Sequence, residues 1–94
     1  MDISDMRRDF ESEGLGRDAL DSNPVGQFQS WFEDAREAGI LEPNAMSLAT
    51  AGRDGMPDLR TVLLKYFDKQ GFVFYTNYRS RKAREMDENP QAAL

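Results

Sequence analysis

The chain has 94 residues, of which 39% are hydrophobic and 31% charged, a composition typical of one small globular domain and too short for a two-domain enzyme. It contains no Cys and no His, which excludes a Cys nucleophile, a Ser-His-Asp triad and a zinc site with Cys and His ligands. No apolar run approaches the roughly 18 residues that span a bilayer, and the first residues lack the features of a signal peptide, so we expect a cytoplasmic protein with no membrane segment.

The net charge of −5 is distributed unevenly along the chain. Residues 1–40 hold ten acidic and four basic side chains, whereas residues 60–84 hold seven basic side chains and one acidic side chain, Asp68. Such a cationic window in an acidic chain indicates either a solvated basic face or a discrete anion-binding site. The overall acidity argues against a general nucleic-acid surface.

Two helices are predicted in the first 40 residues. The spacing of apolar residues favours a short helix over residues 3–13, which a Gly-rich segment then ends. A longer helix is predicted over residues 23–39, with Asn23 as its N-cap, Pro24 in its first position and Gly39 as its stop. Its apolar stripe is expected to pack in the core and consists of Val25, Phe28, Trp31, Phe32 and Ala35.

The second half of the chain favours antiparallel strands. A three-stranded meander is predicted over residues 45–76, with two tight turns between strands at Ala45–Ala51, Leu59–Phe67 and Phe72–Thr76. A helix is predicted over residues 80–89, with Ser80 as its N-cap. Another strand is expected to begin at Ala92, beside the end of the third strand. A meander of this size leaves open edges and a half-covered face, so we expect further strands of a β-barrel or a partner chain to complete it.

The start of the last helix is a candidate phosphate site. Arg81 and Lys82 lie in its first turn, where a cation opposes the positive end of the helix dipole by roughly 0.3–1 kcal/mol. An anion at this position would remove the conflict. The free backbone N–H groups and the Ser80 hydroxyl would add donors to such a cradle, whereas the plainer interpretation is a set of exposed basic residues on a surface helix.

Two further cations lie on the second strand. Arg60 and Lys65 are five residues apart, which places them on opposite faces of a regular strand. A bulge, or two different ligands, would be needed for both to act at one site. Tyr75 and Thr76 end the third strand just before the last helix and can reach a ligand bound at the helix start.

Taken in order, these segments resemble a known family. Arg60–Lys65, Gly71–Asn77 and Ser80–Ala83 are similar to the FMN-binding region of the pyridoxine/pyridoxamine 5′-phosphate oxidases. Arg7–Phe10 and Asp21–Phe32 are similar to the N-terminal half of the same family. Members of that family continue into further strands, so the resemblance identifies the chain with the N-terminal half, and we do not expect these 94 residues to catalyse the reaction alone.

The resemblance implies an α+β fold, mostly β with flanking helices: an FMN-binding split β-barrel that forms a homodimer with FMN between the subunits. The implied FMN-binding residues are Arg60, Thr61, Val62, Leu63, Leu64, Lys65, Tyr75, Thr76, Ser80, Arg81 and Lys82. The implied substrate-binding residues are Lys65, Arg7, Arg8, Asp9 and Phe10, and residues 1–22 would form a segment that covers the substrate.

The implied reaction is oxidation of pyridoxine 5′-phosphate or pyridoxamine 5′-phosphate to pyridoxal 5′-phosphate. A hydride would pass from the substrate to FMN, and dioxygen would reoxidise the flavin. No side chain of this chain is assigned as catalytic, and no metal is expected. Two alternatives stay open, namely another FMN-binding split-barrel oxidoreductase and a non-catalytic dimerisation or anion-binding module.

Overall fold

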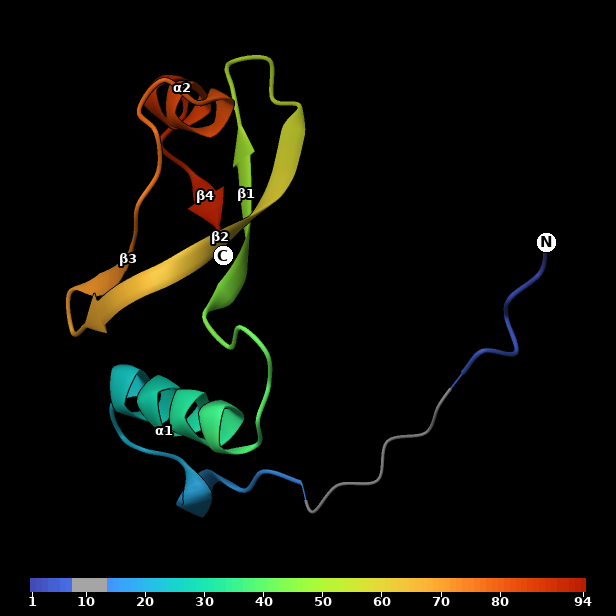
Figure 1. Ribbon diagram of the computed structural model, residues 1–94, viewed down its shortest axis with the longest axis vertical. Helices are drawn as coiled ribbons and strands as arrows, with labels where there is room; N and C mark the ends of the chain where they lie inside the picture. Colours follow the sequence, from blue (N-terminus) through green and yellow to red (C-terminus); the bar gives the residue numbers. More distant parts are fainter. Residues whose placement is uncertain (8–13) are drawn as a thin grey trace.

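The computed structural model describes residues 1–7 and 14–94 (Figure 1). In chain order its elements are the short 3-10 helix Arg17–Ala19, α1 (Pro24–Glu37), β1 (Ala45–Ala51), β2 (Pro57–Asp68), β3 (Gly71–Phe74), α2 (Arg81–Glu88) and β4 (Ala92–Ala93). The strands pair antiparallel in one sheet with the order β3-β2-β1-β4. Figure 1 shows the long β2 curling across the sheet, with α1 at one end of it and α2 at the other. The expected antiparallel architecture with flanking helices is confirmed.

Helix α1 forms where its capping residues predict. The Asn23 side chain accepts a hydrogen bond from the Val25 backbone N–H at 3.0 Å, Pro24 occupies the first turn, and the chain leaves the helix at Gly39 with a φ of +74°. A residue with a side chain would be strained at that φ, which explains the glycine.

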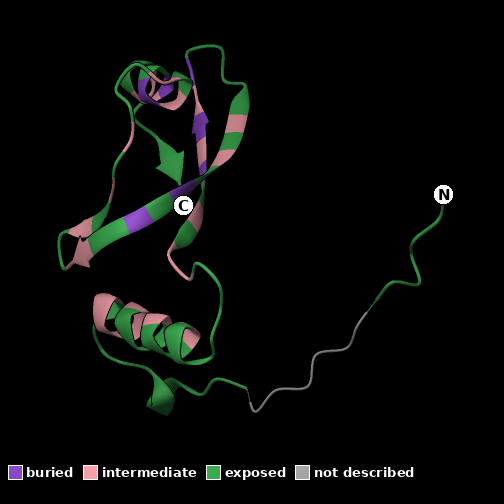
Figure 2. Ribbon diagram, in the orientation of Figure 1, coloured by how far each residue is buried: buried purple, intermediate pink, exposed green. Residues whose placement is uncertain are grey.

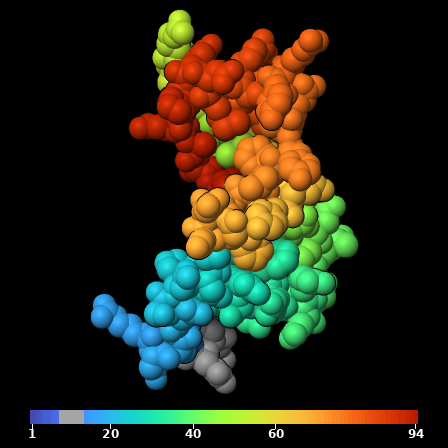
Figure 3. All heavy atoms as spheres, turned by 90° about the vertical axis from the view of Figure 1, so that its left-hand side faces the viewer, coloured from blue at the N-terminus to red at the C-terminus, as the bar shows by residue number. Residues whose placement is uncertain are grey.

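Aromatic rings attach α1 to the β2–β3 hairpin. The Phe28 ring lies edge-on to the rings of Phe67 and Phe72, with centroids 5.0 Å away in both cases. Phe32 stacks on Phe28 at 6.1 Å and meets Phe67 at 6.0 Å. This cluster confirms that Phe28 and Phe32 pack inward. Figure 3 shows α1 seated directly against the hairpin.

Trp31 departs from the predicted stripe, because half of its surface is exposed. It lies on the flank of α1, where it lines a shallow hollow together with Leu15 and Leu20 of the preceding segment. The hairpin is narrow, so it covers only the part of the stripe that carries Phe28 and Phe32. The prediction that Trp31 lies in the core was wrong.

The core of the described residues is thin and lies on the inner face of the sheet. Its buried hydrophobic residues are Leu48 of β1, Val62 and Leu64 of β2, and Ala83 of α2. Along β2 these residues alternate with exposed ones, as a strand with one covered face requires (Figure 2).

The bounds of two strands and the pairing of a third differ from the predictions. β2 begins two residues earlier, at Pro57, and β3 ends at Phe74, so Tyr75 and Thr76 follow the strand. β4 pairs with β1, with Ala93 opposite Ala49, and not beside the end of β3 as expected. The reason is the position of α2, which packs against β1 and returns the chain to that edge of the sheet.

The N-terminal prediction of a helix over residues 3–13 fails in its described part. Residues 3–7 form only a turn, closed by a 3.1 Å hydrogen bond from the Met6 N–H to the Ile3 carbonyl, and the rest of the predicted helix lies outside the described residues. Ile3 and Met6 are exposed, and Figure 1 shows this segment extending away from the sheet. Such a short helix has little stability when its apolar stripe has no surface to pack against.

Replacing Phe28 with Ala tests the aromatic attachment of α1. Because Phe28 contacts three other rings but is only half-buried, we expect Phe28→Ala to lower the free energy of unfolding by about 2 kcal/mol, below the range for a fully buried Phe. Urea unfolding of the full-length protein, followed by circular dichroism, measures the change. Leu41→Ala is the control, since Leu41 is 91% exposed, and an equal loss in both variants would contradict the assignment.

Candidate functional site

The register between β1 and β2 gathers a polar cluster at one end of the sheet. Arg60 lies opposite Leu48, and Asp58 lies opposite Thr50. Alternate residues of one strand point to the same face, and so do residues that pair across two strands. The side chains of these four residues therefore share the inner face of the sheet. This face is the one that α2 covers.

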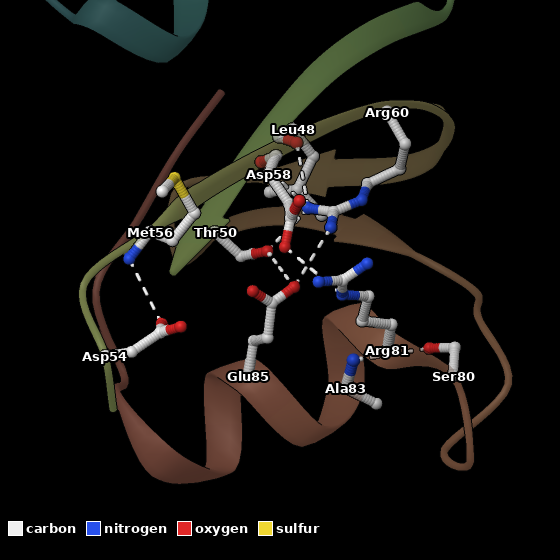
Figure 4. A network of polar contacts seen from close by, with 10 residues as sticks. All are labelled: Leu48, Thr50, Asp54, Met56, Asp58, Arg60, Ser80, Arg81, Ala83 and Glu85. Carbon is white, nitrogen blue, oxygen red and sulfur yellow. Dashed lines mark hydrogen bonds and ion pairs between the residues drawn. The ribbon is translucent and has the colours of Figure 1, made fainter. Parts of the chain in front are cut away.

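Helix α2 begins beside this cluster. The Ser80 hydroxyl accepts a hydrogen bond from the Ala83 backbone N–H at 3.2 Å, which confirms Ser80 as the N-cap. Ala83 and Glu85 are the buried residues of the helix, and Glu85 contacts Thr50 of β1 and Arg60 of β2. Figure 4 shows Glu85 pointing from α2 toward Thr50 and Arg60.

Arg60 is held by four acceptors. Its Nη1 group donates to the Leu48 carbonyl at 3.1 Å, to the Thr50 hydroxyl and to the Asp58 carbonyl at 3.3 Å. Its Nη2 group donates to Glu85 Oε1 at 3.3 Å. The ion pair is largely shielded from water, because the side chains of Arg60 and Glu85 are 21% and 11% exposed.

Arg81 reaches the same place from the first turn of α2. Its Nε lies 3.3 Å from Asp58 Oδ2, and 73% of its side chain is exposed. Asp58 therefore contacts both arginines, Arg60 through its backbone carbonyl and Arg81 through its carboxylate. Figure 4 shows the two guanidinium groups near each other beside the start of α2. An oxyanion arriving there would meet two guanidinium groups and the N-terminal backbone N–H groups of the helix.

The structure separates Lys65 from this cluster. A register shift between Leu64 and Tyr66 forms a bulge in β2 at Lys65, which is the irregularity that the sequence allowed for. Lys65 is exposed and borders a shallow hollow with Phe32 of α1, whereas Arg60 lies at the α2 end of the strand, roughly 16 Å away at strand spacing. A small ligand bound at the α2 end of β2 therefore cannot contact the side chains of both Arg60 and Lys65.

The other predicted site residues lie in several environments. Val62 and Leu64 are buried in the core, so a ligand could reach only their backbone atoms, while Thr61 and Leu63 are exposed on the outer face of β2. Lys82 is half-buried in the first turn of α2. Tyr75 and Thr76 lie in the segment between β3 and α2. Arg7 is exposed in the N-terminal segment, which extends away from the sheet in Figure 1, and Arg8, Asp9 and Phe10 lie outside the described residues.

Comparison with known proteins places this geometry in a family. A family model described as pyridoxamine 5′-phosphate oxidase matches residues 32–94, which include β1 to β4 and the whole polar cluster. The chain belongs to the pyridoxamine 5′-phosphate oxidase family.

Relatives of known name agree with this assignment. A pyridoxine/pyridoxamine 5′-phosphate oxidase from Crocosphaera subtropica is 57% identical over 94 residues, which are 100% of this chain and 44% of that protein. Another, from Rubrobacter xylanophilus, is 56% identical over 93 residues, or 99% of this chain and 43% of that protein. The chain thus spans less than half the length of these oxidases.

A solved structure extends the comparison to the fold. PhzG from Burkholderia lata, crystallised with tetrahydrophenazine-1-carboxylic acid, matches with a TM-score of 0.77 and 34% sequence identity over 85% of this chain and 41% of that chain. Together with the curled antiparallel sheet, this match confirms the expected split-barrel fold. Among the described residues of this family member, no cluster of acidic side chains could hold a metal ion, and no helix is long and apolar enough to cross a membrane.

Sequence reasoning missed three members of the cluster in this oxidase-family chain: Thr50, Asp58 and Glu85. Thr50 and Asp58 become visible only once the β1–β2 register is known, because that register puts them opposite each other beside Arg60. Glu85 had a signal in the sequence. It lies four residues after Arg81, so the two side chains project from the same side of α2.

The stability of this family member should depend on Arg60 and not on Arg81. Arg60→Met leaves the buried Glu85 carboxylate without its cation, and we expect a loss of about 3 kcal/mol in the free energy of unfolding. Arg81→Met breaks an exposed pair, and we expect a loss below about 1 kcal/mol. Thermal and urea unfolding of the full-length protein compare the two variants. Equal losses would show that the Arg60–Glu85 pair is not a special structural contact.

Proposed function

We propose that this chain forms the FMN-phosphate-binding part of an oxidase that converts pyridoxine 5′-phosphate or pyridoxamine 5′-phosphate to pyridoxal 5′-phosphate with dioxygen. The observation that carries the proposal is the convergence of Arg60 and Arg81 at the Ser80-capped start of α2. This cluster lies within the residues that match the oxidase family model. The names of the relatives at 56–57% identity support the same substrate class.

The donors present fit a phosphate monoester. Guanidinium groups bind phosphate oxygens in pairs, and backbone N–H groups at a helix start supply further donors. The chain has no Gly-x-Gly-x-x-Gly loop of the kind that holds a dinucleotide pyrophosphate. The compact site therefore favours FMN, with its single terminal phosphate, over FAD or a nicotinamide dinucleotide.

Each element would contribute a different part of the flavin site. Arg60, Ser80, Arg81 and Lys82 would bind the phosphate, and an oxyanion would compete with Asp58 for Arg81. The strand Arg60–Lys65 would line the flavin, with Val62 and Leu64 contributing backbone atoms because their side chains are buried. The remaining contacts would come from Thr61, Leu63, Lys65, Tyr75 and Thr76. Bound FMN would supply the redox chemistry, accepting a hydride from the substrate and transferring electrons to dioxygen.

The substrate phosphate would be bound at a different place. Lys65 lies at the α1 end of β2, away from the Arg60–Arg81 cluster, so it is free to bind a second anion. Residues Arg7–Phe10 would cover that substrate as part of the N-terminal segment. Two separate phosphate sites would explain why Arg60 and Lys65, the cations of β2, need not lie close together.

Association of two copies would cover the outer face of the sheet. Leu59 and Leu63 are 69% and 38% exposed on that face of β2. Apolar side chains gathered in this way typically mark a protein interface. We propose a homodimer as the functional state and no nucleic-acid partner, in line with the acidic net charge of −5.

The match to PhzG supports a second candidate, an oxidoreductase of the same fold that acts on a different substrate. That structure contains tetrahydrophenazine-1-carboxylic acid, which lacks a phosphate group. The higher identity to the vitamin B6 oxidases, 57% against 34%, favours the phosphorylated substrate. Turnover of pyridoxamine 5′-phosphate by the full-length protein, and its absence with an unphosphorylated carboxylic acid, would distinguish the two.

We expect the full-length protein to bind FMN more tightly than FAD. The physical reason is the single compact set of phosphate donors at the start of α2. Quenching of flavin fluorescence on titration with each nucleotide gives the two dissociation constants. Tighter binding of FAD would contradict the proposed cofactor.

Arg81→Ala should weaken FMN binding much more than Arg84→Ala. Arg81 lies in the first turn of α2 next to the proposed phosphate, and a charge-assisted hydrogen bond of this kind corresponds to roughly 10- to 100-fold in affinity. Arg84 is exposed further along the helix, where we expect a change of about twofold or less. The same fluorescence titration measures both. Equal losses would show that the cationic window acts as a diffuse field and that no discrete cradle exists.

A further inference from the structure

We infer that Glu85 is a positioning residue of the flavin phosphate site: its buried carboxylate fixes the Arg60 guanidinium so that one edge of it faces the start of α2. The inference rests on the proposed function for the identity of the anion. The inference assigns Glu85 no contact with the cofactor. The effect of Glu85 on FMN binding passes through the position of Arg60 alone.

A closed ring of hydrogen bonds carries the inference. Arg60 Nη2 donates to Glu85 Oε1 at 3.3 Å, and Arg60 Nη1 donates to the Thr50 hydroxyl. That hydroxyl in turn donates to Glu85 Oε1 at 3.4 Å. The ring joins β1, β2 and α2, and Thr50 and Glu85 are 3% and 8% exposed. A guanidinium bound at two of its nitrogens to buried partners has little freedom to rotate.

The ring determines which donors of Arg60 can serve a ligand. A guanidinium carries five N–H groups in a fixed fork. The Nη1 group is turned toward Leu48, Thr50 and Asp58, and one Nη2 hydrogen goes to Glu85. The contacts among the described residues leave the Nε–H and the second Nη2 hydrogen, which form one edge of the fork and suit two oxygens of a phosphate.

The charge of Glu85 supports a geometric role. A buried carboxylate beside Arg60 reduces the positive potential at the proposed phosphate site, so it works against anion binding by charge alone. It also lies in the C-terminal half of α2, where the helix dipole disfavours an acid. Glu85 therefore contributes to the position of the Arg60 guanidinium and not to the positive potential of the site.

Glu88 provides a matched comparison on the same helix. It lies one turn after Glu85, and its Oε2 accepts a hydrogen bond from the Arg53 backbone N–H at 2.9 Å in the β1–β2 turn. It also lies close to Gly52, where a Cβ would come within 2.9 Å of Glu88 Oε2. Glu88 thus attaches α2 to the sheet without contact with Arg60.

The test compares Glu85→Ala, Glu85→Gln and Glu88→Gln in the full-length apoprotein. Flavin fluorescence titration gives the FMN dissociation constant, and proton–nitrogen correlation spectra follow the Nε–H signal of Arg60 before FMN is added. We expect Glu85→Ala to weaken FMN binding on the order of tenfold or more and to move the Arg60 signal toward that of a freely rotating arginine. Glu85→Gln keeps an acceptor oxygen and should restore part of both, and Glu88→Gln should change neither.

Unchanged or tighter FMN binding in a folded Glu85→Ala protein, with an unchanged Arg60 signal, would overturn the inference, because it would leave charge as the only effect of Glu85. Equal effects of the Glu85 and Glu88 variants would also overturn it. If Glu85→Ala does not fold, Glu85→Gln decides by the same two readouts. If the unsubstituted protein binds no FMN, the proposed function fails, and the Arg60 signal still shows whether Glu85 positions that side chain.

Discussion

The contact between Arg60 and Glu85 joins the parts of the molecule on which the proposed phosphate site depends. It ties α2 to β2, and through Thr50 it includes β1. Taking both charges out of water is costly, and the cost is offset because every neighbouring polar atom is satisfied: no buried side-chain polar atom among the described residues lacks a partner. A fully connected polar cluster of this kind specifies one arrangement of helix and strands, because any other arrangement would leave a buried charge alone.

Different kinds of interaction attach the helices at the two ends of the sheet. At the α1 end, Phe28 and Phe32 attach the helix to Phe67 and Phe72 through apolar ring contacts, which offer no hydrogen-bond donors to an anion. At the α2 end, polar contacts with defined donors, Arg60 to Glu85 and Arg81 to Asp58, hold the helix against β2. Recognition of a phosphate requires donors at set positions, so the directional end is the one suited to it. The bulge at Lys65 separates these two regions along β2.

Local signals in the sequence predicted most of the elements, and long-range packing determined the rest. Caps and turns are local, so the N-caps Asn23 and Ser80 and the bounds of β1 were predicted correctly, and those of α2 to within one residue at each end. Pairing of β4 with β1 was not, because it depends on where α2 packs. The exposure of Trp31 likewise depends on the width of the hairpin below α1. In the site, the cations were visible as a charge window. The contacts of Thr50 and Asp58 were not, because they are set by the strand register, and those of Glu85 were not, because they depend on how α2 packs against the sheet.

The cationic window of residues 60–84 does not form one face of the molecule. Arg60 is largely buried in a network, Arg81 is exposed beside it, and Lys65 lies at the other end of β2. A surface that attracts polyanions needs its cations exposed and contiguous, so that they act together over a Debye length of roughly 10 Å. Here the acids Asp58 and Glu85 are interleaved with the arginines and cancel part of their field at a distance. The attraction that remains is short-ranged and directional, which suits one phosphate group bound at the start of α2.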